Sequence, residues 1–265
     1  MKHNKVVIKL IQIIILITFI FLWEYLSNHN IINSFVFSSP SKIIRCITTL
    51  YKENNLTNHI FVTLNETIIS FTLSIILSFI ISIVLFEFNI LFKIFEPFFT
   101  VLNSMPKVAL GPLFIILFGA GNKSIIIMAL SITLIINILT IYNGFLSSDK
   151  YLNKLLDTLK ASRIDKIKYL IIPSAYSIII NSLKINISMT LIGVIMGEFL
   201  VSKAGIGYLI IYGTQVFNLT LVMTGIVILM FISYILYIII SKIEKIFNQK
   251  ISNWLLDIFF IFYSS

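Results

Sequence analysis

The residues best placed to do chemistry are ionisable side chains inside otherwise apolar segments. Lys184 and Glu198 both lie in the apolar stretch 177–200, with Asn186 close by. Charged groups inside a membrane segment are costly, so they usually pair or serve a pathway. On one helix their fourteen-residue separation is about 21 Å, so Lys184 and Glu198 cannot pair within one chain. We predict these three residues line a path or gate, the alternatives being snorkelling, loop capping and inter-helix hydrogen bonding.

Other arrangements that support catalysis are missing from the sequence. Gly119–Ser124 approaches a phosphate-binding loop, but Asn122 and Leu117 stand where that motif requires glycine. No Ser/His/Asp set is recognisable, and the histidines show no metal-ligand spacing: His3, His29 and His59. We therefore predict no catalytic residue, metal or cofactor in this chain, and we expect that it is not an enzyme.

Composition points to a membrane protein. Of 265 residues, 58% are apolar and 12% are charged, whereas soluble domains have roughly 45–50% and about 25%. A cytosolic enzyme, a disordered chain and a disulfide-rich secreted scaffold are thereby excluded. The net charge of +9 comes mostly from basic residues between apolar segments, which mark membrane topology rather than nucleic-acid binding.

The elements that must position these residues are six apolar segments, each near the roughly 20 residues of a membrane-spanning helix. They are Val6–Leu26, Thr67–Phe86, Pro97–Phe118, Ser124–Phe145, Ser177–Leu200 and Leu219–Ser241. The third is interrupted by Pro106, Lys107, Gly111 and Pro112, so we expect it to face protein. The prediction is an all-α polytopic membrane protein with about six spans.

Two further patterns concern these spans. Ser70, Ser74, Ser78 and Ser82 recur at every fourth position of the second span, which favours close helix packing over the alternative of lining a substrate path. With the N-terminus inside, thirteen of the twenty Lys and Arg residues lie on the inner side and five on the outer. This bias predicts that both termini are cytoplasmic.

The segment 147–173 is the most informative loop. Leu152, Leu155, Leu156 and Leu159 form one face of a short amphipathic helix. Ser162–Asp165 then has the pattern of a capping box that starts a second helix, and Pro173 marks the return to the membrane. We predict a helix–turn–helix lying flat below the bilayer, which is either an interfacial helix on lipid headgroups or a docking site for a soluble partner.

The same loop resembles the "EAA" loop of bacterial ABC importer permeases. The resemblance lies in Leu156-Asp157-Thr158-Leu159-Lys160-Ala161-Ser162 followed by Leu170-Ile171-Ile172-Pro173. Aligned on Pro173, Lys160 stands at the family's glycine, and Lys154, Leu155 and Leu156 stand at its Glu-Ala-Ala. If that turn needs a positive φ, a lysine there costs roughly 1–2 kcal/mol.

Other segments resemble the nitrate/sulfonate/taurine branch of these permeases, in matching order from about Ser38 to Trp254. They are Ser39-Pro40-Ser41, Thr63-Leu64, Ser104-Met105-Pro106, Gly111-Pro112-Leu113-Phe114, Phe118-Gly119, Gly197-Glu198 and Gly205-Ile206-Gly207-Tyr208-Leu209. The resemblance implies a MetI-like permease core at 61–254 with a cytoplasmic coupling helix. It is preceded by an N-terminal span and external segment (1–60) and followed by a C-terminal extension (255–265).

The resemblance also implies a function and partners. The chain would be a permease subunit of an ATP-driven importer of a small polar solute, such as a sulfonate, nitrate, taurine or a thiamine precursor, in the bacterial cytoplasmic membrane. A cytoplasmic ABC ATPase would bind ATP and Mg, an extracytoplasmic solute-binding protein would deliver solute, and a second permease copy would complete a homodimer. The implied ATPase-coupling residues are Leu155, Leu156, Asp157, Leu159, Lys160, Ala161, Ser162 and Pro173.

Two other functions stay open at this point. An ion-coupled secondary transporter would be expected to show internal repeats and paired ionisable groups near the bilayer midplane, and we find neither pattern in the sequence. A decayed or non-transporting membrane scaffold is the other possibility, because Lys160 and the missing Glu-Ala-Ala residues weaken the loop pattern.

Overall fold

The computed structural model describes residues 2–29, 31–53 and 56–263, and of these the side chains of all but 2–5 and 248–263. Within those ranges the regular secondary structure is helical, which confirms the predicted all-α class. In chain order the helices are α1 (Lys2–Asn28), α2 (Ser34–Phe37), α3 (Pro40–Glu53), α4 (Leu56–Glu87), α5 (Asn89–Ser104), η1 (Lys107–Leu110), α6 (Gly111–Phe118), α7 (Asn122–Leu146), α8 (Lys150–Thr158), α9 (Arg163–Lys166), η2 (Ile167–Ile171), α10 (Ile172–Val201), α11 (Ile206–Gln215) and α12 (Leu219–Tyr263).

Five helical segments in the described ranges are long and apolar enough to cross a membrane, and a bent pair of helices supplies a sixth candidate. The five are Val6–Asn28, Leu56–Glu87, Asn122–Leu146, Arg163–Val201 and Leu219–Phe247. The predicted number of about six spans agrees with this result. The division into 1–60, 61–254 and 255–265 stays a prediction, and residues 264–265 lie outside the described ranges.

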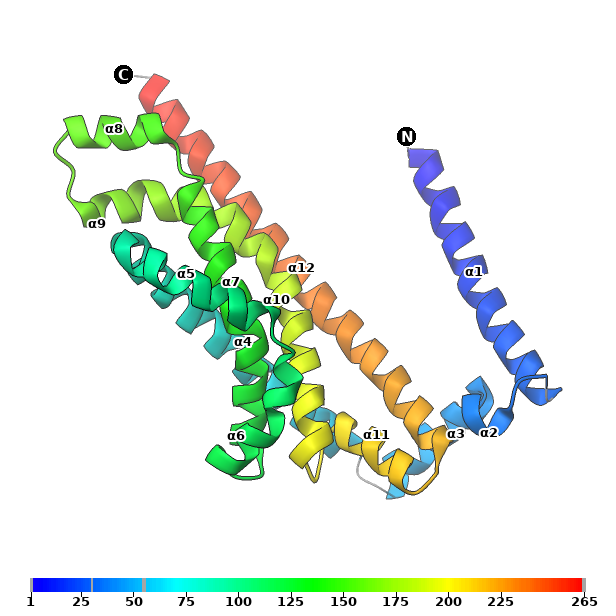
Figure 1. The fold of residues 1–265 in the computed structure, drawn as a ribbon. Coiled ribbons are helices and arrows are strands. Elements are labelled where there is room, and N and C mark those ends of the chain that lie inside the picture. Colours follow the sequence, from blue (N-terminus) through cyan, green and yellow to red (C-terminus); the bar gives the residue numbers. More distant parts are fainter. Residues whose placement is uncertain (1, 30, 54–55, 264–265) are drawn as a thin grey trace. The chain divides into compact units, whose positions relative to one another are not determined.

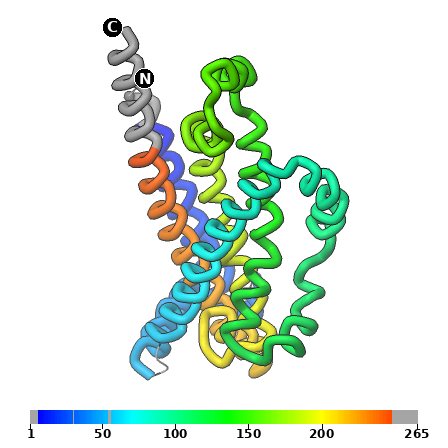
Figure 2. Tube along the Cα trace, turned by 90° about the vertical axis from the view of Figure 1, so that its left-hand side faces the viewer, coloured from blue at the N-terminus to red at the C-terminus, as the bar shows by residue number. Residues whose placement is uncertain are grey.

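The bent pair is the irregular third span. Helix α5 ends at Ser104, and the segment Lys107–Phe118 continues at an angle of 92° (Figure 2). Met105 has an extended ψ of 143°, which is the conformation favoured before a proline, and Pro106 has no N–H to continue the helix. The predicted interruption is therefore confirmed, although α5 begins at Asn89 and passes through Pro97.

Pro173 does not interrupt the helix of the fifth span. The helix continues from Arg163 to Val201 through α9, η2 and α10, and the return to the membrane at Pro173 stays a prediction. The five residues Ile167–Ile171 form a wider π-helical turn just before the proline. Such a turn removes the need for the N–H that proline lacks, so the helix passes Pro173 without a break.

Contacts divide the chain into two compact units. The first contains residues 1–63 and 202–231 and therefore includes α1, α2, α3 and α11. Within it, the backbone N–H of Gly205 donates to His59 Nδ1 at 3.0 Å, and that of Ile206 donates to Thr63 Oγ1 at 2.8 Å. These bonds satisfy two of the orphan N–H groups at the start of α11.

The second unit, residues 64–201 and 232–265, is built around the close pairing of α7 and α10 (Figure 1). Gly193 and Gly197 of α10 lie against Ala129 and Ile125 of α7. A Cβ atom at Gly193 would lie 2.6 Å from the Cα atom of Ala129. The missing side chains therefore allow the two backbones to approach, as small residues do in membrane helix pairs.

Helix α4 packs on the same pair through its serine stripe. Ser70, Ser74, Ser78 and Ser82 are all completely buried. The side chain of Asn137 on α7 donates to Ser74 Oγ at 2.8 Å, and Ser82 Oγ donates to the Ile138 carbonyl at 3.0 Å. The stripe therefore mediates helix packing, which was the favoured interpretation of the pattern.

We predict that Gly193→Ala lowers the thermal stability of the detergent-solubilised protein, by about 1–3 kcal/mol, because the added methyl group meets the backbone of α7. Ser188→Thr adds one methyl group at an exposed position of the same helix and is the matched control. Thermal unfolding followed by circular dichroism measures both. Equal melting temperatures for the two variants would contradict this account of the α7–α10 contact.

Candidate functional site

The predicted loop helix is α8, which projects as a separate short helix between α7 and α9 (Figure 1). Asp149 caps its start by accepting a hydrogen bond from the Tyr151 N–H at 2.7 Å. Three leucines on one side of α8 are exposed: Leu152 (47%), Leu155 (53%) and Leu159 (68%). We call these three residues the α8 apolar face. Because nothing in the second unit covers it among the described residues, it is available to a partner or to lipid.

At the end of α8 lies the turn in which Lys160 stands at the position of the glycine in the EAA loop. The Ala161 N–H donates to the Leu156 carbonyl and the Lys160 N–H to the Asp157 carbonyl, both at 3.0 Å. This pair of bonds defines a Schellman motif, whose key residue normally is a glycine with positive φ. Lys160 occupies that position with φ 55°. The turn therefore does need a positive φ, and lysine adopts it here.

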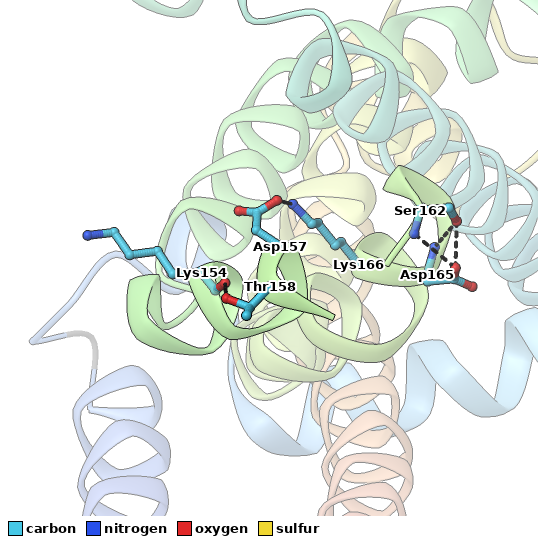
Figure 3. Close-up of polar contacts among 6 residues, drawn as sticks. All are labelled: Lys154, Asp157, Thr158, Ser162, Asp165 and Lys166. Atoms are coloured by element: carbon cyan, nitrogen blue, oxygen red, sulfur yellow. Dashed lines mark hydrogen bonds and ion pairs between the residues drawn. The ribbon is translucent and has the colours of Figure 1, made fainter. Parts of the chain in front are cut away.

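A capping box starts the next helix, as the sequence predicted (Figure 3). The Asp165 N–H donates to Ser162 Oγ at 3.2 Å, and the Ser162 N–H donates to the Asp165 carboxylate at 3.1 Å. These reciprocal bonds satisfy free backbone groups at the helix start. They fix the direction in which the chain leaves the turn.

Two ion pairs that the sequence did not reveal anchor this loop. Lys166 on α9 pairs with Asp157 on α8 across the turn (Figure 3). Arg163 pairs with Glu87 at the end of α4, with 2.9 Å between Nη1 and Oε1. Their partners lie nine and 76 residues apart in the chain, so no helical period connects them. The Asp157–Lys166 pair and the caps give α8 a defined position relative to α9, and the Arg163–Glu87 pair joins α9 to α4.

The eight predicted coupling residues do not all lie on the exposed side. Leu155, Asp157, Leu159, Lys160 and Ser162 are exposed, whereas Leu156, Ala161 and Pro173 are half-buried. Pro173 is also distant along the helix, inside α10. An exposed partner surface would therefore be formed by Leu155 and Leu159, while Leu156 and Pro173 shape the loop.

Lys184, the first of the three predicted path residues, is held by α12. Its ammonium group forms an ion pair with Glu244 and lies 5.7 Å from the centre of the Tyr237 ring. The sequence did not indicate this partner, because nothing in the helical period of α10 points to α12. Lys184 is therefore a link between two helices, and a role in a path stays a prediction.

Asn186 and Glu198 are buried at other levels of α10, so the structure does not bring the three together. Asn186 is 3% exposed, and its side-chain oxygen accepts a hydrogen bond from Thr190 Oγ1 at 3.3 Å. Glu198 is completely buried, and its carboxyl group faces that of Glu66 on α4. Both side chains are buried between packed helices in this chain. A gating role for either residue stays a prediction.

Within the described ranges, no group of three or more His, Cys, Asp or Glu side chains could hold a metal ion. The polar side chains described above for the second unit thus form helix caps, hydrogen bonds between helices and ion pairs. Such an arrangement can position a loop rigidly and connect helices.

Comparison with known proteins gives this geometry a context. Residues 83–253 match a protein family described as "Binding-protein-dependent transport system inner membrane component". A probable ABC transporter permease protein of Haemophilus influenzae is 24% identical over 82% of this chain and 87% of that protein. The formylaminopyrimidine transport permease protein ThiX of Halalkalibacterium halodurans is 26% identical over 71% of this chain and 74% of that protein.

A third relative is the putative aliphatic sulfonates transport permease protein SsuC of Bacillus subtilis, which is 23% identical over 88% of this chain and 83% of that protein. Among solved structures, an inward-facing conformation of the MetNI methionine ABC transporter matches with a TM-score of 0.60 and 16% identity. The match covers 73% of this chain and 97% of that chain. At this identity the likeness shows a shared fold.

We predict that Lys160→Gly strengthens the turn after α8 and that Lys160→Val weakens it. Glycine adopts a positive φ without the clash that costs an L-residue about 1 kcal/mol, while a β-branched side chain increases the clash. Hydrogen exchange of the Lys160 and Ala161 amide groups measures the effect. Faster exchange in the glycine variant than in the wild type would contradict the assigned turn.

We also predict that Lys184→Met lowers the melting temperature, because Glu244 is then left as a partly buried charge without its cation. The double variant Lys184→Met with Glu244→Leu should regain most of the loss. Lys168→Met, which removes an exposed lysine, is the control. If the double variant is no more stable than Lys184→Met alone, the ion pair is not what joins α10 to α12.

Proposed function

The chain belongs to the family of binding-protein-dependent transport system inner membrane components, and on that premise we propose how it works within an importer. It is the permease subunit of an ABC importer, a multi-pass component of the inner membrane. We propose that α8 is the element through which a cytoplasmic ABC ATPase drives it, and that both termini are cytoplasmic. The observation that carries this proposal is the exposed α8 apolar face on a loop fixed by caps and ion pairs.

Docking on a protein explains the loop better than rest on lipid does. An interfacial helix needs an apolar face and basic flanks but no fixed direction. Here a Schellman turn, a capping box and the Asp157–Lys166 pair set the direction of α8 relative to the helix that follows. Such ordering favours transmission of a movement, because a force on α8 passes into the continuous helix Arg163–Val201.

The remaining parts of the importer would be supplied by other chains. The ATPase would bind ATP and Mg, and an extracytoplasmic solute-binding protein would deliver the solute. A second copy of this chain would complete a homodimer of permeases. In this arrangement the chain contributes the membrane path and no cofactor of its own.

The transported solute would be small and polar. The relatives are named for aliphatic sulfonates, formylaminopyrimidine and riboflavin. The sequence resemblance adds nitrate and taurine-like anions to these candidates, and among them we favour a sulfonate-like anion or a thiamine-precursor pyrimidine. A decayed permease is less well supported, because the turn after α8 keeps its full hydrogen-bond pattern with Lys160 in place of glycine.

We predict that Leu155→Asp abolishes the association with the ATPase, because the substitution would place an unpaired carboxylate in a dry protein interface. Leu155 is preferable to Leu156, which is half-buried within the chain itself. Asn153→Asp introduces the same charge at another exposed position of α8 and is the matched control.

The first measurement is co-purification of the tagged chain from its native membranes in a mild detergent, followed by mass spectrometry for an ABC ATPase. The second measurement is ATP-dependent uptake by membranes that contain the same variant. The wild type and Asn153→Asp should retain both the ATPase and uptake. Retention of both by Leu155→Asp, at equal expression, would show that α8 is not the docking element.

A further inference from the structure

The broken third span contains a lysine, Lys107, whose hydrogen-bond partners differ from those of Lys184 in the fifth span. Lys107 is the one charged residue between Pro97 and Phe118. It begins η1, directly after the break at Met105 and Pro106. Broken backbone within a membrane segment is tolerated only against protein or along a water-filled cavity. The position of Lys107 is therefore expected to face protein or water rather than lipid.

The packing of α6 places Gly111, four residues after Lys107, beside the start of α7 and the end of α10. A Cβ atom at Gly111, the first residue of α6, would touch Met128 of α7 at 3.4 Å and also Leu200 of α10. Met128 lies six residues into α7, a rise of about 9 Å from Asn122. Leu200 lies at the same end of α10, next to its last residue, Val201. With both termini cytoplasmic, this is the outer half of the membrane.

Lys107 has no acidic partner among the described residues. Ion pairs in those ranges engage Arg163, Lys166 and Lys184. The Lys107 ammonium group instead donates to the carbonyl oxygen of Asn103 at 3.4 Å and to its side-chain oxygen at 3.3 Å. Both acceptors are neutral, so the positive charge of Lys107 is not balanced by a carboxylate.

A capping role accounts for part of this geometry. The carbonyl of Asn103 lies in the last turn of α5, and a cation there interacts favourably with the helix C-terminus. However, an ammonium group has three donors, and the two bonds to one residue are long. The half-buried Lys107 also lies next to two exposed polar side chains, Asn103 and Ser104, whose exposed neighbours Leu102 and Val108 are apolar. The arrangement holds a cation in place and leaves donor capacity unused.

We propose that Lys107 is an anion-binding subsite on the solute path, and that it takes the negatively charged oxyanion group of the solute, such as a sulfonate or carboxylate. The side-chain NH2 group of Asn103 would supply a further hydrogen bond to the same group, whereas the Ser104 hydroxyl already donates to the Val101 carbonyl. A lysine suits this task because its compact ammonium group can bind an oxyanion from several directions and release it again. The inference rests on the proposed importer function and specifies the chemical class of its solute.

The first experiment measures the subsite without transport. The purified wild-type complex is treated with an amine-reactive acylating reagent, and modification of Lys107 is followed by mass spectrometry. Ethanesulfonate and acetate are the anionic probes, and ethyl methyl sulfone, which is similar in size to ethanesulfonate but uncharged, is the control. We expect at least one anion to slow modification of Lys107 while leaving that of the exposed Lys93 unchanged. Equal protection by the neutral sulfone, or protection by no anion, would overturn the proposal.

The second experiment measures uptake in proteoliposomes that contain the whole importer. Lys107→Gln should lower uptake of the protecting anion about tenfold, since it removes one charge-assisted hydrogen bond. Lys107→Arg should keep most of it, and Lys93→Gln is the control. Both Lys107 variants must retain the ATPase, which separates loss of the subsite from misfolding. Unchanged uptake in Lys107→Gln would overturn the anion subsite.

The two experiments also separate this inference from the function on which it rests. Protection of Lys107 by an anion in a protein without ATP-dependent uptake would support the subsite and contradict the importer. ATP-dependent uptake of a neutral aminopyrimidine that is the same in the wild type and Lys107→Gln, with no anion protecting Lys107, would support the importer and contradict the subsite.

Discussion

The fold depends on one constraint, which is that backbone N–H and C=O groups in lipid must find partners within the protein. The apolar segments meet it by forming long helices, and the segments around Pro106 and Pro173 meet it in different ways. Before Pro173 the helix widens into a π-helical turn and continues, so Arg163–Val201 is one unbroken helical segment. At Pro106 the helix stops instead and restarts at Lys107 in a new direction. Pro173 thus lies in a continuous helix, whereas Pro106 coincides with a break and a change of direction.

Close packing joins α4, α7 and α10 into one group of helices, which we call the frame. The glycines of α10 let it lie against α7, and the buried serines let α4 approach the same pair. The frame carries the loop between α7 and α10, because Glu87 at the end of α4 pairs with Arg163 at the start of α9. In the proposed importer, a displacement of α8 would therefore act on several packed helices at once rather than on a flexible loop.

Four basic residues of the second unit show two different arrangements with different physical roles. Arg163, Lys166 and Lys184 each have a carboxylate partner, and their ion pairs connect helices or cross a turn. Lys107 has neutral acceptors and lies at a break in the backbone. A paired cation serves structure, while a cation without a carboxylate in the membrane is available for a ligand of opposite charge.

Local patterns in the sequence were sufficient for much of this protein. Apolar segment lengths determined the spans, the leucine spacing determined α8, and Ser162 with Asp165 determined the capping box, because these features depend on residues within about one or two helical turns. The interruption at Pro106 followed for the same reason. Only the tertiary structure decided that the helix passes through Pro173, that Leu156 is half-buried, and that Lys184 meets Glu244 and Glu198 meets Glu66. These outcomes depend on how separate helices pack against one another, and a helical period carries no information about the residues on a neighbouring helix.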